Sequence, residues 1–383
     1  MQLSAIGAMT AMDPKTIMVI SGALGAVMSI VLYLLKRSYP PSIRGVELWA
    51  LSLAMSFIGG ALFSTTGKLP TPLSTTLPSW MIFFGPYISM VGTQRFFGAT
   101  PRHLPWVALI LMAAGTSAWF TYMQPDYGTR LQLSTAVVAT VCLAHAWLVW
   151  QKSGKTLAGR IALGVLICAG AVQLMRLVTA GLYPAGESAL DASPQNVTYL
   201  AAFAFAIVLI AISQVLLATE RLREELERAA THDSLTDAYT RRYMKEALQR
   251  ELSRCLRHKR QMAVLLIDID HFKKVNDSLG HQEGDRVLTD FVANIKSLLR
   301  SADLLGRFGG EEFVVLLPET TLAVASTVAH RVRSAMSSWG GPTVSIGVTA
   351  SHATGDSVDA LLARADGAMY RAKSKGRNRV ETA

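Results

Sequence analysis

The first 217 residues contain seven long apolar stretches separated by short polar connections. A bilayer with a hydrocarbon core of about 30 Å needs about 20 apolar residues in each spanning helix, and each stretch approaches that length. The stretches cover residues 16–35, 46–64, 79–97, 105–123, 131–150, 158–180 and 199–219. This pattern predicts an all-α transmembrane bundle of about seven helices. We do not expect the first stretch to be a cleavable signal peptide, because no basic segment precedes it and six apolar stretches follow.

After residue 218 the pattern changes to short apolar runs that alternate with amphipathic segments. Continuous apolar runs are typical of buried strands, whereas apolar residues every three or four positions are typical of helices. Strands are predicted at 263–269, 313–317 and 344–348, and helices at 284–300, 322–338 and 358–375. Strands that alternate with helices indicate an α/β fold.

A short heptad pattern joins the two parts of the chain. Val215, Thr219, Leu222, Leu226 and Ala229 are spaced by 4, 3, 4 and 3 residues, as at the a and d positions of a coiled coil. We therefore predict a linker that continues the last apolar helix and pairs two chains. A single amphipathic stalk has the same pattern over two heptads, and this alternative stays open. The predicted domains are a membrane sensor at 1–217, a coiled-coil signalling linker at 218–232 and a second domain at 233–383.

Charge is distributed very unevenly along the 383 residues. Residues 1–217 hold twelve Lys or Arg and five Asp or Glu, so about 8% are charged, against roughly 25% in soluble domains. Residues 218–383 hold 25 basic and 22 acidic residues, or about 28%. This division excludes a single soluble globule and a disordered chain, and three cysteines provide no disulfide framework. Because most of the net charge of +10 lies in the apolar part, we do not expect nucleic acid binding.

The connections between the apolar stretches differ in their content of Lys and Arg. One set of connections holds Lys36, Arg37, Arg44, Arg95, Arg102, Lys152, Lys155 and Arg160, whereas the other set and the N-terminus hold Lys15, Lys68 and Arg130. Basic connections face the cytoplasm. We therefore predict a multi-pass protein of the inner (cytoplasmic) membrane, with its N-terminus outside and the second domain in the cytoplasm.

Four polar residues within the predicted spans are candidates for function or packing: His145, Gln173, Arg176 and Gln214. A charge within the membrane is costly and often functional, but Arg176 lies near the outer end of its span, so we favour snorkelling toward water. His145 has no second ligand at helical spacing, which favours helix packing over metal or haem ligation. The outer loop 182–196, with Glu187 and Asp191, is a candidate external ligand site.

Two acidic clusters occur at predicted strand ends. Asp268 and Asp270 close one strand, and Glu311 and Glu312 open another. Carboxylates are hard oxygen ligands suited to Mg²⁺. The glycine pair at 309–310 predicts a hairpin turn and also permits a nucleotide to approach the backbone. Either cluster alone has an alternative interpretation as a solvated turn, but together they indicate metal-assisted phosphoryl chemistry.

From about residue 231 to residue 380 the chain resembles the GGDEF-domain diguanylate cyclases, in a GGEEF variant. The motif stands at 309–313, and HDSLTD, DIDHFKKVND, GHQEGD, RFGGEEF, VSIGV and ADGAMYRAKSKGRN follow the order of the family. The resemblance implies a nucleotidyl-cyclase-like α/β domain with an antiparallel or mixed sheet flanked by helices. One segment departs from the usual D-x-L-T-G-L-x-N-R-R, because Asp237, Ala238 and Thr240 replace Gly, Leu and Asn. We expect this departure to affect how the linker packs on the domain.

The resemblance also implies an activity, namely the condensation of two GTP molecules into cyclic di-GMP with release of two pyrophosphates. Each domain of a homodimer would hold one GTP. Asp268 and Glu311, with the Ile269 carbonyl beside them, resemble the ligands of Mg²⁺, or of Mn²⁺ in its place. The metal would neutralise developing charge and lower the pKa of the attacking 3′-hydroxyl, and Glu311 or Glu312 would help to deprotonate that hydroxyl.

The remaining site residues follow from the same resemblance. The residues that would bind substrate are Lys273, Asn276, His281, Asp285, Gly309, Gly310, Lys373 and Arg377. Asn276 and Asp285 match the donors and acceptors on the edge of guanine. Lys373 and Arg377, one helical turn apart, resemble a triphosphate clamp. Their alternative interpretation is a basic helix C-terminus favoured by the helix dipole.

Arg300 and Asp303 stand at the R-x-x-D position of the family, where an inhibitory site binds the product. Arg331 and Arg254 are candidate further members of this site. An Arg can make bidentate contacts with guanine or phosphate. The alternative is a surface ion pair worth at most about 1 kcal/mol.

We conclude from the sequence that the chain is a membrane-anchored diguanylate cyclase. The expected partners are GTP, cyclic di-GMP as product and inhibitor, membrane lipid, and a second copy bound through the linker and the GGDEF domain. The alternative is a catalytically silent receptor that binds GTP or cyclic di-GMP and signals by protein contact. A transporter is disfavoured, because the sequence shows no convincing inverted repeat.

Overall fold

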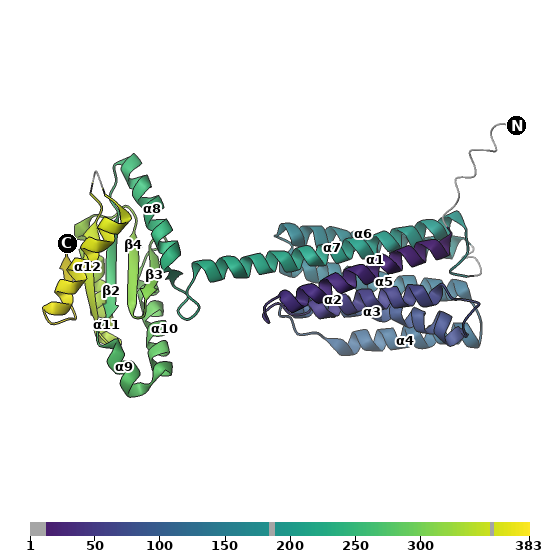
Figure 1. Ribbon diagram of the computed structural model, residues 1–383. Coiled ribbons are helices and arrows are strands. Elements are labelled where there is room, and N and C mark those ends of the chain that lie inside the picture. Colours follow the sequence, from purple (N-terminus) through teal and green to yellow (C-terminus); the bar gives the residue numbers. More distant parts are fainter. Residues whose placement is uncertain (1–12, 184–187, 353–355) are drawn as a thin grey trace. The chain divides into compact units, whose positions relative to one another are not determined.

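The computed structural model describes residues 13–183, 188–352 and 356–383 (Figure 1). The chain forms two compact units, Met1–Arg223 and Glu224–Ala383. The boundary between them falls within one long helix, α7 (Pro194–Thr231). Each unit has its own hydrophobic core.

The first unit is a bundle of long helices that run side by side (Figure 1). Its helices are α1 (Pro14–Ser38), α2 (Val46–Phe63), α3 (Leu77–Phe96), α4 (His103–Tyr122), α5 (Tyr127–Ser153), α6 (Leu157–Leu182) and α7, with a short π-helical segment, η1 (Pro72–Thr76), before α3. Each helix overlaps one predicted apolar stretch. The predicted all-α architecture is therefore confirmed.

Six of the described helices are long and apolar enough to cross a membrane. The exception among the seven is α3, where Pro78, Pro86 and Gln94 interrupt the apolar residues. Helix α1 shows how the outside of the unit is built, because it leaves Val27 and Ile30 exposed. Exposed aliphatic side chains of this kind suit a lipid environment. The number of spans and their orientation remain predictions.

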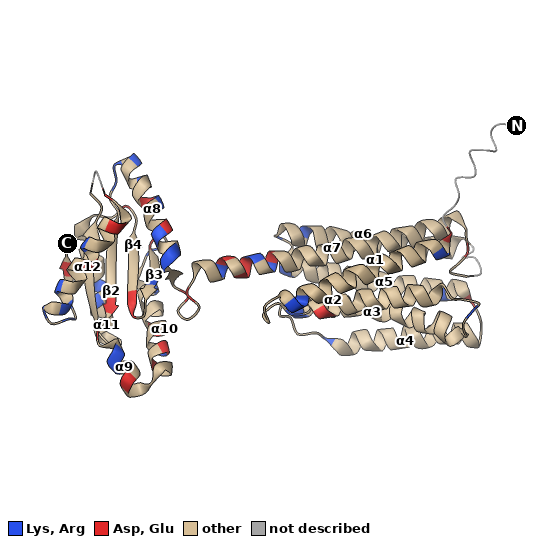
Figure 2. Cartoon of the chain, viewed as in Figure 1, with Lys and Arg blue, Asp and Glu red and all other residues tan. Residues whose placement is uncertain are grey.

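Charged side chains are sparse along the middle of the bundle and gather toward its ends (Figure 2). Inside, a few polar side chains link neighbouring helices. The Trp49 indole donates to the Thr93 hydroxyl at 3.0 Å, and His145 Nε2 lies 2.7 Å from the same hydroxyl. Gln214 donates to the Ser89 hydroxyl at 2.8 Å. These contacts join α2, α5 and α7 to α3, so the interpretation of His145 as a packing residue is confirmed.

The second unit is built on a six-stranded mixed sheet. Its strands are β1 (Tyr239–Thr240), β2 (Ala263–Ile269), β3 (Leu304–Gly309), β4 (Glu312–Leu317), β5 (Val344–Ala350) and β6 (Val380–Thr382), in the order β1-β3-β4-β2-β5-β6. The pairs β1–β3 and β5–β6 are parallel, and the other pairs are antiparallel. Strand β2 is buried along its whole length, as its continuous apolar run predicted.

Helices cover both faces of this sheet. They are α8 (Arg241–His258), α9 (Phe272–Leu279), α10 (His281–Leu298), α11 (Leu322–Ser338) and α12 (Val358–Ser374). On one face, Ile267 of β2 belongs to a core with Phe291 of α10, and on the other Leu266 belongs to a core with Leu248 of α8 and Leu361 of α12. The alternation follows from the two-residue period of a strand. All the predicted strands and helices occur, whereas α8 and α9 were not predicted.

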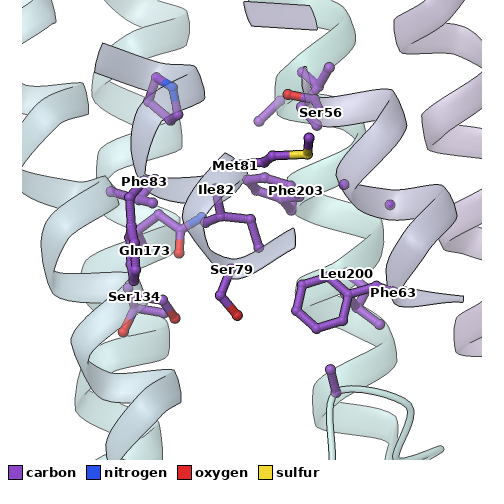
Figure 3. A pocket seen from close by; sticks show the side chains of 18 of the residues that line it. Ser56, Phe63, Ser79, Met81, Ile82, Phe83, Ser134, Gln173, Leu200 and Phe203 are labelled. Carbon is purple, nitrogen blue, oxygen red and sulfur yellow. The ribbon is translucent and has the colours of Figure 1, made fainter. Parts of the chain in front are cut away.

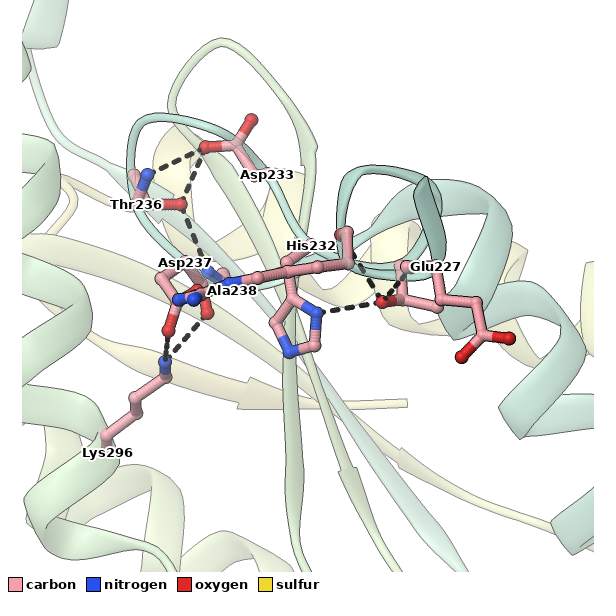
Figure 4. A network of polar contacts seen from close by, with 9 residues as sticks. Glu227, His232, Asp233, Thr236, Asp237, Ala238 and Lys296 are labelled. Carbon is pink, nitrogen blue, oxygen red and sulfur yellow. Dashed lines mark hydrogen bonds and ion pairs between the residues drawn. The ribbon is translucent and has the colours of Figure 1, made fainter. Parts of the chain in front are cut away.

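The segment that departs from the family pattern contacts the end of α7. Asp237, which stands where the family has Gly, keeps a left-handed backbone with φ of 54°. Its carboxylate pairs with Arg228 at 2.9 Å and with Lys296 at 3.6 Å (Figure 4). The Arg228 hydrogen bond is the largest cause of the lowered pKa of Asp237. Thr240 donates to the Ala230 carbonyl at 3.0 Å. The substituted residues thus tie the last turn of α7 to the sheet and to α10.

Candidate active site

The two acidic clusters lie beside each other at one end of the sheet. Strand β2 pairs with β4 in antiparallel register, which places Asp268 opposite Glu312. The Ile269 amide donates to the Glu311 carbonyl at 3.3 Å. Strands β3 and β4 form the hairpin predicted from the glycine pair, with Gly310 and Glu311 between them. The carbonyl and carboxylate oxygens of two distant sequence segments are therefore brought together.

A buried ion pair occupies the centre of this site. Lys373, from α12, places Nζ 2.7 Å from Oδ2 of Asp268. Burial raises the pKa of Asp268, and the Lys373 ion pair lowers it without cancelling that effect. The charges of Glu311 and Glu312 raise the pKa further. The carboxylates of Asp268, Glu311 and Glu312 thus lie close enough to influence one another, and Lys373 supplies an opposing positive charge.

The donor atoms at this end of the sheet suit a hard divalent cation. Among the residues that the structure describes, no group of three or more His, Cys, Asp or Glu side chains could hold a metal ion. Mg²⁺ does not require such a group, because it commonly takes one or two carboxylates and completes its shell with water and phosphate. Asp268 and a glutamate of the β3–β4 turn meet that requirement, since carboxylates dominate here. The residues therefore fit the predicted metal.

Asp270, the second carboxylate of the first cluster, has a structural role instead. Its oxygens accept hydrogen bonds from the hydroxyls of Thr343 at 2.8 Å and Ser345 at 2.7 Å, and from the backbone N–H of Asn378 at 3.0 Å. The side chain is buried and well satisfied by these donors. Asp270 thus anchors the C-terminal turn to the sheet and is not available as a metal ligand.

Arg307 is a site residue that the sequence analysis did not identify. Its Nε and Nη2 donate to the Gly310 carbonyl at 3.0 and 2.8 Å, and its Nη1 donates to Asp233 at 3.1 Å. Burial raises the pKa of Asp233, but hydrogen bonds from Thr236 and Arg307 outweigh burial and leave the pKa lowered. Arg307 therefore holds the glycine turn against the HDSLTD segment. The sequence feature that could have identified Arg307 is its position at the start of the RFGGEEF motif.

The two glycines of the motif are not required by packing within the domain. A Cβ at Gly310 would meet no atom within 4 Å, and one at Gly309 would approach only the Glu312 carboxylate, at 3.9 Å. Neither residue has a positive φ. The space beside the turn is open, as the predicted approach of a nucleotide requires.

The residues predicted to recognise guanine meet where α9 and α10 pack together. Asn276 lies on α9 and Asp285 on α10. A Cβ at Gly284 would overlap the side-chain oxygen of Asn276, so this glycine permits the close approach. Asp285 and His281, at the start of α10, are exposed to solvent. The arrangement leaves a carboxylate and an amide accessible side by side.

The predicted clamp differs from the sequence expectation in one respect. Helix α12 ends at Ser374, so Lys373 lies in its last turn but Arg377 lies beyond it. Arg377 has a left-handed backbone with φ of 58°, after Gly376 with φ of 110°. The statement that the two basic residues are one helical turn apart is therefore wrong, because the chain turns at Gly376. Arg377 and Lys273 are both exposed.

The R-x-x-D segment forms a compact turn. The Arg300 amide donates to the Asp303 carboxylate at 2.8 Å, and the Asp303 amide donates to the Arg300 carbonyl at 3.0 Å. Arg331, from α11, donates to the Leu298 carbonyl at 2.7 Å and so reaches the same segment. Arg254 instead pairs with Glu319. Arg300, Asp303 and Arg331 are thus brought into one exposed region.

Comparison with known proteins identifies this unit. The sequence model of the family described as "Diguanylate cyclase, GGDEF domain" matches residues 230–379. Residues 230–379 belong to the GGDEF family. The recognition from the ordered motifs is therefore confirmed.

Several known proteins resemble the GGDEF domain of this chain. Response regulator PleD of Caulobacter vibrioides is 43% identical over 177 residues, covering 42% of this chain and 38% of PleD. Diguanylate cyclase DgcM of Escherichia coli is 44% identical over 166 residues, covering 42% of this chain and 40% of DgcM. The crystal structure of the coiled coil and GGDEF domain of DgcB from Caulobacter crescentus with c-di-GMP is 32% identical, covers 45% of this chain and 97% of that chain, and has a TM-score of 0.42. The chain spans about two fifths of the length of these curated relatives.

Proposed function

We propose that the protein is a membrane-anchored diguanylate cyclase that condenses two GTP molecules into cyclic di-GMP. The observation that carries this proposal is the cluster of Asp268, Glu311, Glu312 and Lys373 at the end of β2, within a domain of the GGDEF family. Every side chain that the proposed chemistry needs is present at its motif position. The Glu at the third motif position preserves the carboxylate of the family's Asp.

In the proposed reaction, each 3′-oxygen attacks the α-phosphorus of the other GTP, forms a phosphodiester bond and expels pyrophosphate. Asp268 and Glu311, with the Ile269 carbonyl, would hold the ion. Mg²⁺ bound there would supply charge neutralisation and lower the pKa of the attacking hydroxyl. Glu311 or Glu312 would accept the proton from that hydroxyl.

Lys373 would exchange partners when substrate binds. In the structure its ammonium neutralises Asp268. With the charge of the carboxylates balanced by a bound cation, the ammonium of Lys373 would be free to contact the triphosphate. The exposed side chains of Lys273 and Arg377 would supply further positive charge. This exchange accounts for a lysine that serves both as a structural partner and as a phosphate ligand.

Guanine selectivity would come from Asn276 and Asp285, with His281 close by. A carboxylate accepts from the N1 and N2 donors of guanine, whereas adenine would leave the carboxylate unmatched. Each domain has one such pocket and so would bind one GTP. The two phosphodiester bonds of the product would need a second GTP. Two domains must therefore face each other, which supports an active homodimer joined through the linker.

The membrane part of the proposal is carried by the apolar helices of the first unit. We place the N-terminus outside the inner membrane and the GGDEF domain in the cytoplasm, because of the basic connections. Leu226, at a predicted a position of the linker, is 61% exposed in the single chain. An exposed leucine at this position supports pairing of two linkers.

The direct test is the purified fragment 218–383, dimerised by a fused leucine zipper and supplied with GTP and Mg²⁺. We expect cyclic di-GMP, and loss of at least about 100-fold in turnover for Glu311→Gln, since a metal ligand is removed. Glu246→Gln, which alters an exposed glutamate of α8 that pairs with Arg242, is the matched control and should keep full activity. GTP binding without any cyclic di-GMP would overturn the enzyme assignment and favour the receptor alternative.

Product inhibition at Arg300, Asp303 and Arg331 is tested on the same fragment. Arg300→Ala should leave initial turnover unchanged and raise the concentration of cyclic di-GMP needed for inhibition by at least about tenfold, as expected for loss of a bidentate contact. Arg242→Ala, at another exposed arginine, serves as the control. Inhibition of equal strength in both variants would contradict this site.

A further inference from the structure

The helical unit contains a cavity of about 280 Å³, lined mainly by α1, α2, α3, α5, α6 and α7 (Figure 3). A cavity needs only roughly 10–15 Å³ of such space to hold one water molecule, so this one is large enough for a small organic molecule. The body of the cavity is lined mainly by apolar side chains: Phe63, Met81, Ile82, Phe83, Leu200 and Phe203. A small ligand with a mainly apolar body fits such a space.

Gln173 of α6 is a buried polar group that faces this cavity. Its side chain projects among the lining residues (Figure 3), and the residue is only 7% exposed. Within the described part of the chain it has no hydrogen-bond partner. By contrast, the hydroxyls of Ser79 and Ser134, which also line the cavity, donate to the carbonyls of Thr75 at 2.7 Å and Leu131 at 2.9 Å. The Gln173 amide is therefore free to form hydrogen bonds with a molecule in the cavity.

Two arginines line the same cavity. Arg176 lies three residues after Gln173 on α6, so the two side chains share one face of the helix. Arg130 comes from the first turn of α5, which runs antiparallel to α6 and is linked to its end by a hydrogen bond from Gln132 to the Ala180 carbonyl at 3.2 Å. The guanidinium groups therefore lie at the end of the cavity near the loop that precedes α7. This loop contributes Ser188 and its two successors to the lining.

The described partners of both guanidinium groups are neutral. Arg176 donates to Asn196 at 3.0 Å and lies over the ring of Tyr199, with 5.6 Å between the guanidinium carbon and the ring centroid. Arg130 donates to the Thr121 hydroxyl at 3.2 Å and to the Asp126 backbone carbonyl at 3.4 Å, and it lies over the ring of Tyr127 at 5.8 Å. Since a guanidinium has five donors, several remain for a ligand. The snorkelling interpretation of Arg176 is incomplete, because its guanidinium is held at a cavity wall.

Acidic groups near this end of the bundle are otherwise engaged. The Asp126 carboxylate accepts from the amide and hydroxyl of Thr129 at 3.2 and 2.6 Å, and Asp191 accepts from the Ser193 amide at 3.0 Å. Neither carboxylate lines the cavity. Glu187 of the predicted ligand loop lies outside the described residues. Within the described residues, no carboxylate forms an ion pair with either arginine, so both guanidinium groups can still accept a carboxylate partner.

We infer that this cavity binds a small amphipathic carboxylate. The carboxylate would lie between Arg130 and Arg176, with the Gln173 amide as a further donor, and the hydrocarbon chain would occupy the apolar body. Charge-assisted bonds from arginine to a carboxylate are strong, and a charged side chain within a membrane protein favours a partner of opposite charge. A straight-chain acid of eight carbons is a suitable test ligand, because it joins one carboxylate to a short apolar chain. The inference concerns the helical unit and does not rest on the proposed cyclase activity.

The test uses the full chain in nanodiscs of phosphatidylcholine, which carries no net charge, and measures equilibrium binding of radiolabelled octanoate. We expect saturable binding that Arg176→Gln weakens at least tenfold and Gln173→Leu weakens severalfold. Arg160→Gln is the matched control, because Arg160 lies on the same helix, is exposed and does not line the cavity. It should bind octanoate as the unmodified chain does.

Radiolabelled octanol distinguishes loss of the cationic end from loss of the fold. It should bind Arg176→Gln as strongly as it binds the unmodified chain, since it needs only the apolar body. The inference is overturned if the unmodified chain shows no saturable octanoate binding, or if Arg160→Gln and Arg176→Gln lose affinity equally. It is also overturned if phosphatidylglycerol in the nanodisc abolishes octanoate binding, because the arginines would then hold a lipid headgroup.

Discussion

Replacement of Lys373 by Met removes the positive charge that lies 2.7 Å from Asp268 while it keeps most of the aliphatic side chain. The Asp268 side chain is 9% exposed and the Lys373 side chain 31% exposed. Loss of one partner from a buried pair costs about 3–5 kcal/mol, and partial exposure of the lysine lets solvent screen the pair. We therefore expect a loss of about 2–3 kcal/mol in the free energy of unfolding, below the range for fully buried pairs.

Thermal unfolding of fragment 218–383 measures this loss, since the unit beginning at Glu224 has its own cores. For a domain of this size each kcal/mol lowers Tm by roughly 2–4 °C, so Lys373→Met should lower Tm by about 4–12 °C without Mg²⁺. Addition of Mg²⁺ should raise Tm more in Lys373→Met than in the unmodified fragment, because the ion replaces the missing charge beside Asp268.

Lys375→Met is the control for this prediction, because Lys375 also lies at the end of α12 but pairs with Glu381, away from the acidic clusters. We expect it to respond to Mg²⁺ as the unmodified fragment does. If Lys373→Met unfolds at the same temperature as the unmodified fragment, or if both lysine variants gain the same stability from Mg²⁺, the assignment of Asp268 as a shared ligand of lysine and metal is refuted.

Three further predictions concern the two units and the linker. Asp237→Gly should change the free energy of unfolding by less than about 1 kcal/mol, whereas Asp237→Ala should lose about 1–2 kcal/mol, because Gly accepts the left-handed backbone; equal losses on urea denaturation would contradict this reasoning. Hydrogen bonds from Arg364 lower the pKa of Asp356, so this carboxylate stabilises the fold above its unfolded pKa of about 3.9 and the effect is lost as pH falls through the lower folded pKa. Asp356→Asn should therefore be less stable at pH 7 but converge with the unmodified fragment in acid, and a constant difference in urea midpoints would argue against the pair. A cysteine at Leu222 should crosslink two chains in native membranes, and recovery of monomer alone would count against the coiled coil.

The sequence predicted the features that depend on neighbours along the chain. The division between an apolar and a charged part, the buried strand β2 and the hairpin turn between β3 and β4 each follow from local patterns of apolar and turn residues. The family motifs identified the carboxylates of the site because they are short and contiguous. Helix α8 was not predicted, since its many charged residues conceal a narrow apolar stripe that includes Leu248.

Only the tertiary structure decided which distant groups meet. Arg307 contacts Asp233 across 74 positions in the sequence, because the glycine turn reaches the segment before β1. Asp270 and Asp268 belong to the same acidic cluster in the sequence. In the fold Asp270 accepts a hydrogen bond from the Ser345 hydroxyl, whereas Asp268 lies opposite Glu312. The spacing of apolar residues along the chain predicts which side chains are buried. Which residues contact one another depends on strand order, register and the point where a helix ends.

The cavity in the helical unit illustrates the same limit. The sequence identified Gln173 and Arg176 as polar residues in an apolar helix, and their spacing placed them on one face. It did not show that Arg130 of another helix faces the same space or that Gln173 lacks a partner there. Those facts arise from how the helices pack, since a cavity forms where packed helices leave space between them.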